Sequence, residues 1–277
     1  MLQSAERTSR KSGPSYVNAI LPKAAQDSAA RPLSVQRLVV NVLQDQKHIW
    51  LFPVRLIRGQ SWKPTLIFLL ITGALLTLDP FDPSYFRHTN AFHMLNQVVS
   101  GHNATVAMWF VMLSALALGF MRHDEYLKGT FFFAFQAVLD SEILTQTLKG
   151  IDRRVRPQDV HHYQHFWDSW FQDKGTWYSG PGSFPSGHMI AAISIAAVFA
   201  IRYRHHRWAP WAAYTAAGII GVSRITLLSH FPSDVFAGAF LGYVIVRYVV
   251  LRPPDAPAGR VDKIPEDEEM TRVGVLT

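Results

Sequence analysis

Six long apolar stretches, most of them separated by short polar connections, make up the middle of the chain. They cover approximately residues 62–77, 104–121, 131–148, 188–203, 208–228 and 235–251. A transmembrane helix needs about 20 predominantly apolar residues, and Trp and Tyr near helix ends are typical of the membrane interface. We therefore predict an all-α protein in which residues 62–251 form an integral membrane six-helix bundle. Taken singly, the short first stretch and the third, which contains Asp140 and Glu142, also suit buried helices of a soluble bundle.

The regions on either side of these stretches have a different composition. Residues 1–33 are polar and poor in large apolar side chains, and residues 252–277 are Pro-rich and then acidic, so we expect a disordered tail at each end. In residues 34–61, apolar positions such as Leu38 and Val42 recur at helical spacing. We expect an amphipathic helix here that either lies at the membrane interface or packs on the bundle.

The distribution of Lys and Arg predicts the orientation in the membrane. The chain has a net charge of +7, which suits anionic lipid surfaces. Its basic residues lie at the ends of apolar stretches and not in one stripe, which disfavours nucleic acid as a partner. Short cytoplasmic loops are enriched in Lys and Arg, and four regions on one side of a six-span arrangement carry them, so we expect both termini to be cytoplasmic. These residues are Lys47, Arg55, Arg58, Lys63, Arg122, Lys128, Arg204, Arg207 and Arg252.

The connection between the third and fourth stretches does not follow this charge rule. It carries Lys149, Arg153, Arg154, Arg156 and Lys174 on the side expected to be outside. A phosphate-binding site on the outer face would explain the exception; the alternative is that long loops obey the rule poorly. The aromatic side chains within 158–184 would form a lid over that site or anchor the loop at the interface.

A glycine-containing stretch comes directly before the fourth apolar segment. Ser186 is placed to cap a helix whose first residues are Gly187 and His188. The amides at a helix N-terminus bind anions, and Gly187 would let a phosphate oxygen approach the backbone. On its own, Ser-Gly-His at a helix start is more often only a cap.

Two further stretches add a second histidine and more cations. His230 and Asp234 flank Pro232, which suits the first turn of a helix, so that Asp234 would reach back towards His230 and orient its ring. Arg224 would lie near the outer end of the fifth stretch. Lys149 ends the third stretch and Arg156 follows shortly after; an Arg fork and a Lys point charge together complement a phosphoryl group.

These three stretches resemble the signatures of a known family. Lys-x6-Arg-Pro at 149–157, Pro-Ser-Gly-His at 185–188 and Ser-Arg-x5-His-x3-Asp at 223–234 are similar, in full and in order, to those of the type 2 phosphatidic acid phosphatase superfamily, which shares its fold with vanadium haloperoxidases. The resemblance covers roughly residues 62–251. It implies a haloperoxidase-like phosphatase core that hydrolyses a lipid phosphate or diphosphate without metal or other cofactor.

The resemblance also implies a role for each matching residue. His230 would be the nucleophile that forms a phosphohistidine, Asp234 would orient it, and His188 would protonate the leaving group. The phosphate would be bound by Lys149, Arg156, Ser186, Gly187 and Arg224. Phosphatidic acid, phosphatidylglycerol phosphate, a glycolipid phosphate and an isoprenoid diphosphate such as undecaprenyl diphosphate are all compatible substrates, and the motifs leave the oligomeric state unknown.

Several polar residues lie outside the three motifs, and two other functions are compatible with parts of the sequence. Asp140 and Glu142 are expected to make interhelical hydrogen bonds or to support the site from behind, and His161, His162 and His165 to face solvent, not to bind metal. The chain contains no cysteine, so thiolate metal sites are excluded. The alternatives are a vanadate-dependent peroxidase, disfavoured because those relatives are soluble, and a non-catalytic lipid-binding or transport protein, disfavoured because the reactive residues are all present.

Overall fold

The structure, a computed structural model, describes residues 35–162, 169–171 and 182–251. Every regular element in these residues is helical, as the apolar pattern predicted. The predicted tails at 1–33 and 252–277 lie outside the described residues, as does most of the aromatic connection. The elements are α3 (Val35–Trp50), α4 (Phe52–Ile57), α5 (Trp62–Leu78), α6 (Asp82–Arg87), α7 (His93–Val98), α8 (Gly101–Met121), α9 (Glu125–Asp152), η1 (Pro157–His162), α10 (Gly187–Arg202), α11 (Trp208–Thr226), α12 (Pro232–Ile245) and the π-helical turn η3 (Val246–Val250).

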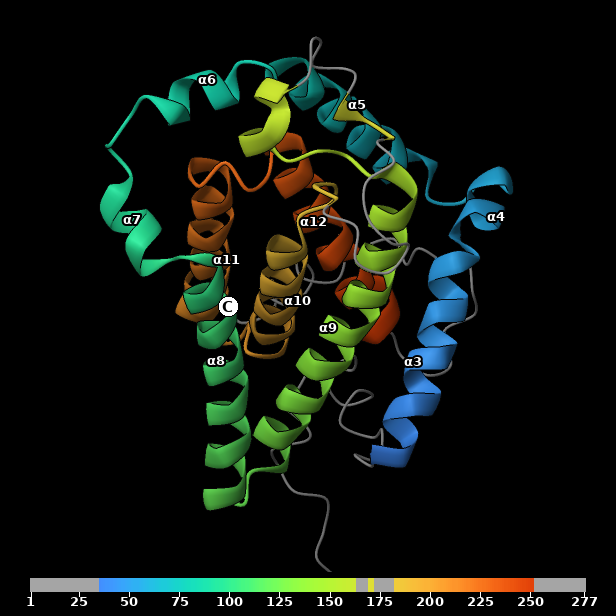
Figure 1. The fold of residues 1–277 in the computed structure, drawn as a ribbon. Helices are drawn as coiled ribbons and strands as arrows, with labels where there is room; N and C mark the ends of the chain where they lie inside the picture. Colours follow the sequence, from blue (N-terminus) through green and yellow to red (C-terminus); the bar gives the residue numbers. More distant parts are fainter. Residues whose placement is uncertain (1–34, 163–168, 172–181, 252–277) are drawn as a thin grey trace, which may run out of the picture.

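Helix α10 lies at the centre of the bundle, between α9, α11 and α12 (Figure 1). Ala and Ile make up more than half of its residues, and eleven of its sixteen residues are buried. Helix α12 approaches it closely through glycines: a Cβ added to Gly238 would lie 2.8 Å from the carbonyl oxygen of Ser186, and one added to Gly242 would lie 2.7 Å from that of Ile190. Side chains at these two positions would therefore push the two helices apart.

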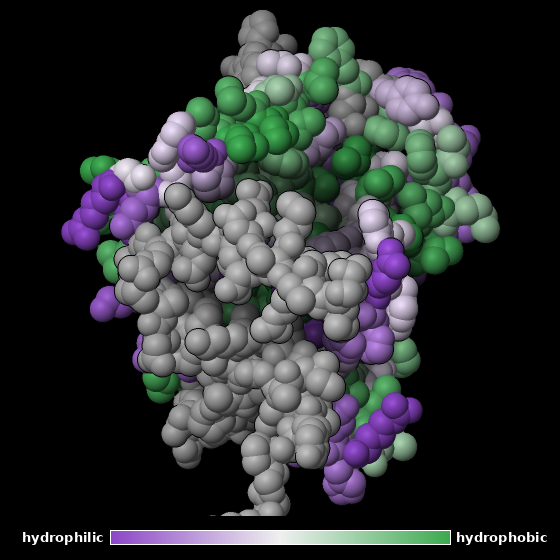
Figure 2. All heavy atoms as spheres, turned by 180° about the vertical axis from the view of Figure 1, so that it is seen from behind, coloured by the Kyte–Doolittle hydropathy of each residue, from purple (hydrophilic) through white to green (hydrophobic). Residues whose placement is uncertain are grey.

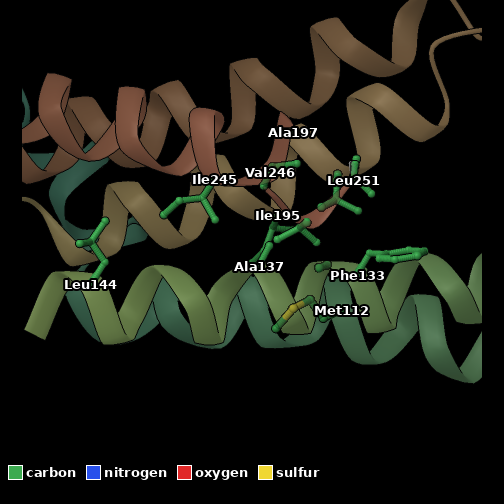
Figure 3. Packing of buried hydrophobic residues seen from close by; sticks show 12 residues of the cluster. Met112, Phe133, Ala137, Leu144, Ile195, Ala197, Ile245, Val246 and Leu251 are labelled. Atoms are coloured by element: carbon green, nitrogen blue, oxygen red, sulfur yellow. The ribbon is translucent and has the colours of Figure 1, made fainter. Parts of the chain in front are cut away.

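The apolar core runs along the inner faces of four helices and η3. Met112 of α8, Phe133 and Ala137 of α9, Ile195 of α10 and Ile245 of α12 belong to one buried cluster (Figure 3). These side chains face one another because each helix turns one stripe inward. The core thus holds the helix ends in fixed positions relative to one another.

Each of the six predicted apolar stretches falls largely within a helix, namely α5, α8, α9, α10, α11 and the pair α12–η3. Two helices of the described part, Gly101–Met121 and Pro232–Val250, are long and apolar enough to cross a membrane by length and composition. Many large apolar side chains are exposed on α5 and α8. Figure 2 shows apolar residues gathered near the upper end of the face seen from behind.

Helix α3, within the segment predicted to be amphipathic, lies against α9. Gln46 donates hydrogen bonds from Nε2 to Asp140 Oδ1 at 2.9 Å and to the Asp140 carbonyl at 3.2 Å, and Gln136 of α9 donates to the Asp45 carboxylate. Asp140 therefore makes the interhelical hydrogen bond that was one of its two predicted roles. Glu142, by contrast, is exposed and accepts a hydrogen bond from Gln146 of its own helix.

Candidate active site

The predicted site residues come from helix ends that meet at one end of the bundle. Lys149 is in the last turn of α9, Gly187 and His188 are in the first turn of α10, Arg224 is in the last turn of α11, and Asp234 is in the first turn of α12. Because neighbouring helices run in opposite directions, the C-terminal ends of α9 and α11 lie beside the N-terminal ends of α10 and α12. Three sequence stretches are thereby combined in one site.

The loop before α12 folds back on the end of α11 and buries His230. The amides of Ser229 and His230 both donate to the carbonyl of Arg224, at 3.0 and 3.2 Å. His230 Nδ1 lies 2.7 Å from the carbonyl oxygen of Ser183. A carbonyl only accepts hydrogen bonds, so Nδ1 carries the hydrogen and the lone pair of the neutral ring is on Nε2. An imidazole held in this tautomer can attack through Nε2.

Asp234 is close to His230 but is not hydrogen-bonded to it. Its Oδ2 lies 3.8 Å from His230 Nδ1 and accepts hydrogen bonds from the Phe231 amide at 2.9 Å and from Ser183 Oγ at 2.5 Å. Asp234 therefore lies beside the ring, as predicted, while the hydrogen bond of Nδ1 goes to the Ser183 carbonyl. The reason is local: as the third residue of α12, Asp234 caps the start of its own helix, and the Ser183 carbonyl takes the imidazole hydrogen.

Arg154 is a buried member of the site that the motifs did not identify. Its Nη1 donates to Asp234 Oδ1 at 2.5 Å and to Ser233 Oγ at 2.9 Å, and its Nη2 donates to Asp79 Oδ2 at 2.7 Å. Arg154 and both carboxylates are fully buried. The sequence offered one weak signal, the excess of arginines in a connection expected to lie outside. Nothing in that signal separated Arg154 from Arg153 and Arg156.

Asp79 and Ser183 were also missed. Asp79 follows the last residue of α5 and accepts hydrogen bonds from the side chain and, at 3.2 Å, from the amide of Ser233. Ser183 links two parts of the site, because its amide donates to the Arg154 carbonyl at 2.7 Å while its hydroxyl donates to Asp234. Each lies outside the three motifs, so only its position in the fold connects it with them.

The predicted phosphate-binding groups are arranged around the start of α10. Ser186 caps this helix by accepting a hydrogen bond from the Met189 amide, as predicted. A Cβ added to Gly187 would lie 3.5 Å from Lys149 Nζ, so the bare backbone of Gly187 faces that ammonium group. Arg156 is close enough to interact electrostatically with both Lys149 and His230. Cationic groups and helix N-terminal amides of this kind can hold a phosphate.

His188 and Arg224 contact the segment that leads into α8. His188 Nε2 lies 3.1 Å from the Gly101 carbonyl oxygen and 3.3 Å from Thr105 Oγ1, and Arg224 donates to the Val99 carbonyl. A Cβ at Gly101 would lie 3.2 Å from Arg224 Nη1, so this glycine permits the close approach. His188 also interacts electrostatically with His230, which places both predicted histidines in the same site.

The electrostatic environment of His230 favours its neutral form. Burial lowers the pKa of the His230 imidazole; the positive charges of Lys149 and Arg156 also lower it, whereas the Asp234 carboxylate opposes them. The lone pair on Nε2 is therefore available at neutral pH.

Three histidines of the connection after α9 are candidate metal ligands by composition. His161 and His162 lie in η1, and His165 lies outside the described residues. Within 35–162, 169–171 and 182–251, no three His, Asp or Glu residues are grouped so as to hold a metal ion.

Comparisons with known proteins match the part of the chain that builds most of this site. Residues 130–257 match a family model described as the PAP2 superfamily. A lipid A 1-phosphatase of Rhizobium johnstonii is 33% identical over 111 residues, covering 40% of this chain and 42% of that protein, and one of Rhizobium etli is 32% identical over 111 residues, covering 40% and 44%. The chain spans less than half the length of these curated relatives.

Two further similarities either cover a smaller part of this chain or correspond to a weaker structural superposition. The bacitracin transport permease protein BcrC of Bacillus licheniformis is 36% identical over 72 residues, covering 26% of this chain and 34% of that protein. The crystal structure of a transmembrane PAP2-type phosphatidylglycerolphosphate phosphatase from Bacillus subtilis superimposes with a TM-score of 0.45 at 22% identity, covering 67% of this chain and 91% of that one. The resemblance predicted from the three motifs is confirmed by the family match.

Proposed function

Because residues 130–257 belong to the PAP2 superfamily, we propose that this protein is an integral membrane phosphatase that hydrolyses a lipid phosphate or diphosphate through a phosphohistidine. The observation that carries the proposal is the His230 tautomer. Its Nδ1 is bound to the Ser183 carbonyl at 2.7 Å, which leaves Nε2 to attack beside a group of cations. A buried histidine with no catalytic role has no need of Lys149 and Arg156 nearby.

The reaction proceeds in two balanced steps. In the first, the Nε2 lone pair of His230 attacks the terminal phosphorus, and the bond breaks between phosphorus and the leaving oxygen, which is the lipid oxygen of a monophosphate or the bridging oxygen of a diphosphate. His188 gives its proton to that oxygen. In the second, His188 takes a proton from water as the water oxygen attacks phosphorus, the N–P bond breaks, and inorganic phosphate leaves. Lys149, Arg156 and Arg224, with the amides that begin α10, stabilise the charge on the phosphoryl oxygens in both steps.

The substrate class follows from the membrane setting of the site. The exposed apolar side chains of α5 and α8 would face lipid, and the site lies at one end of the bundle, where a lipid head group would be. Two relatives are described as lipid A 1-phosphatases, so a glycolipid 1-phosphate is the first substrate to test. Phosphatidic acid, phosphatidylglycerol phosphate and an isoprenoid diphosphate complete the panel.

The deciding experiment is phosphate release from this panel by the purified chain in detergent, with a chelator present and His230→Ala as the blank. We expect release from at least one lipid that depends on His230. Equal release by the variant, or none from any lipid, would contradict the proposal. His205→Ala is a matched control, because His205 is exposed in the loop between α10 and α11, which is at the opposite end of α10 from His188.

We further propose that both termini are cytoplasmic and that the site opens on the outer face. The natural absence of cysteine makes this directly measurable. A single cysteine introduced at Asp159, in η1, should react with a membrane-impermeant maleimide in intact spheroplasts. One introduced at His205 should react only after lysis, and the reverse pattern would invert the orientation.

A further inference from the structure

The guanidinium of Arg154 joins three separate elements beside His230. It lies in the loop after α9 and donates to Asp234 at the start of α12 and to Asp79 at the end of α5. The rings of Trp170 and Phe231 lie 4.4 and 4.1 Å from its Cζ, measured to their centroids. The ion pairs and the rings together fix the plane of the guanidinium.

This arrangement also fixes Asp234, whose two oxygens have different partners. Oδ1 accepts from Arg154, and Oδ2 accepts from Ser183 Oγ and from the Phe231 amide. The carboxylate cannot rotate without breaking a buried ion pair, which is costly. Ser183 is thereby held as well, and its carbonyl is the group that accepts the His230 Nδ1 hydrogen. A continuous chain of contacts therefore runs from Asp79 to the imidazole.

We propose that Arg154, held in place by Asp79 and Ser233, is a positioning residue for phosphoryl transfer: it orients His230 through Asp234 and Ser183 and does not itself bind the phosphate. This role rests on the proposed function. All of the guanidinium hydrogen bonds described above point to Asp79, Ser233 and Asp234, whereas Lys149 of α9 extends its Nζ to Gly187 at the start of α10. A small displacement of an attacking atom can reduce the rate about 10²-fold, so the chain of contacts matters for kcat.

The charges of the network add a second expectation. Two carboxylates and one guanidinium leave a net negative charge near His230, which favours the positive imidazole ring of the phosphohistidine. The other charged or titratable groups that act on His230 are Lys149 and Arg156 from the α9 side and His188 from α10. Removing the Asp79 charge leaves Arg154 compensated by Asp234 alone. The pH at which His230 becomes protonated should then fall.

The test compares Arg154→Lys and Asp79→Asn in the purified full-length chain. Lysine keeps the charge but cannot span both carboxylates, so we expect kcat to fall about 10- to 100-fold with KM within about 3-fold. Asp79→Asn should lower kcat less than Arg154→Lys does. It should also shift the acidic limb of the pH profile to lower pH by roughly half a unit. Arg153→Lys, in the neighbouring residue of the same loop, is the matched control and should stay within about 2-fold.

Inhibition by inorganic phosphate separates positioning from phosphate binding. Arg156→Lys should raise the inhibition constant about 10-fold, and Arg154→Lys should leave it within about 2-fold. An equal rise in both variants, an unchanged kcat in Arg154→Lys, or an unmoved acidic limb in Asp79→Asn would overturn the assignment. If Arg154→Lys does not fold, the positioning role is tested with Asp79→Asn and Ser233→Ala instead. Failure of the phosphatase proposal can be distinguished from failure of the Arg154 assignment, because in the first case the wild-type chain would release no phosphate.

Discussion

Two clusters of buried polar side chains join distant parts of this chain, and they differ in the groups that donate hydrogen bonds to their carboxyl groups. At the site, Arg154 lies between Asp79 and Asp234 and bonds to both. Midway along α9, the amide of Gln46 donates to Asp140, the amide of Gln136 donates to Asp45, and the two carboxyl groups also interact with each other. The positive charge of a guanidinium favours the ionised form of both carboxyl groups and gives their bonds a fixed direction, whereas an amide supplies only a neutral hydrogen bond.

The difference indicates what each cluster is suited to. Ionised, oriented carboxylates can hold a reacting imidazole, and the Arg154 cluster adjoins His230 through Ser183. The Asp140 cluster connects α3 to α9, and such polar contacts favour one packing arrangement of helices in a membrane. We therefore assign function to the first cluster and helix association to the second. The following predictions test this difference between the two clusters.

The largest expected effect is on turnover. His230→Ala should reduce phosphate release at least about 10⁴-fold, because the proposed nucleophile is lost. Asp140→Asn, the matched change in the other cluster, should retain at least about half of the activity. Phosphate release under saturating substrate measures both, and a comparable loss in the two variants would remove the functional distinction between the clusters.

The second prediction compares the unfolding free energies of one variant from each cluster. Arg154→Met leaves Asp79 and Asp234 buried without their cation and should cost about 3–5 kcal/mol of unfolding free energy. Asp140→Asn keeps the side-chain volume and an oxygen that can accept the hydrogen bond from Gln46, so it should cost less than about 1 kcal/mol or stabilise the protein. Chemical unfolding in detergent compares them. If Asp140→Asn proves the more damaging change, the second cluster holds an ion pair that the contacts described above do not reveal.

The third prediction concerns His188, at the edge of the site. A lipid alkoxide is a poor leaving group and needs a proton, whereas a departing phosphate needs less help, so His188→Ala should slow monoester cleavage about 10²-fold or more and diphosphate cleavage about 10-fold. The ratio of kcat/KM values on the two substrates measures the difference. Equal losses on both would argue against His188 as the acid.

The smallest expected effect is a displacement of the pH profile. Neutral His230 is the attacking form, and burial lowers its pKa. The acidic limb of kcat/KM should therefore lie below about 6.5, the ordinary pKa of histidine. Because the substrate phosphate also titrates, the profile should be recorded on two substrates with different phosphate pKa values, so that the limb common to both is assigned to the enzyme. A common limb at or above 6.5 would contradict the inferred environment of His230.

Local sequence signals predicted much of this molecule because they act over a few residues. Ser186 caps α10 and Pro232 begins α12, as the preferences of serine and proline at helix starts indicated. The apolar periodicity located the long helices. The meeting of the motifs at one end followed from placing each at the end of an apolar stretch. The pattern also placed Asp234 beside His230, but it could not predict that the main-chain carbonyl of Ser183 contacts Nδ1, because a residue pattern carries no information about main-chain contacts between distant segments.

Composition and motif spacing were enough to predict the helical class, the helix ends that carry the site residues and the family resemblance on which the proposed chemistry rests. The tertiary structure alone decided how those groups are held. Arg154 and Asp79 are 75 positions apart, and Arg154 and Asp234 are 80 apart. No local preference relates residues at such separations, since they meet only because α5, α9 and α12 pack with their ends together around α10.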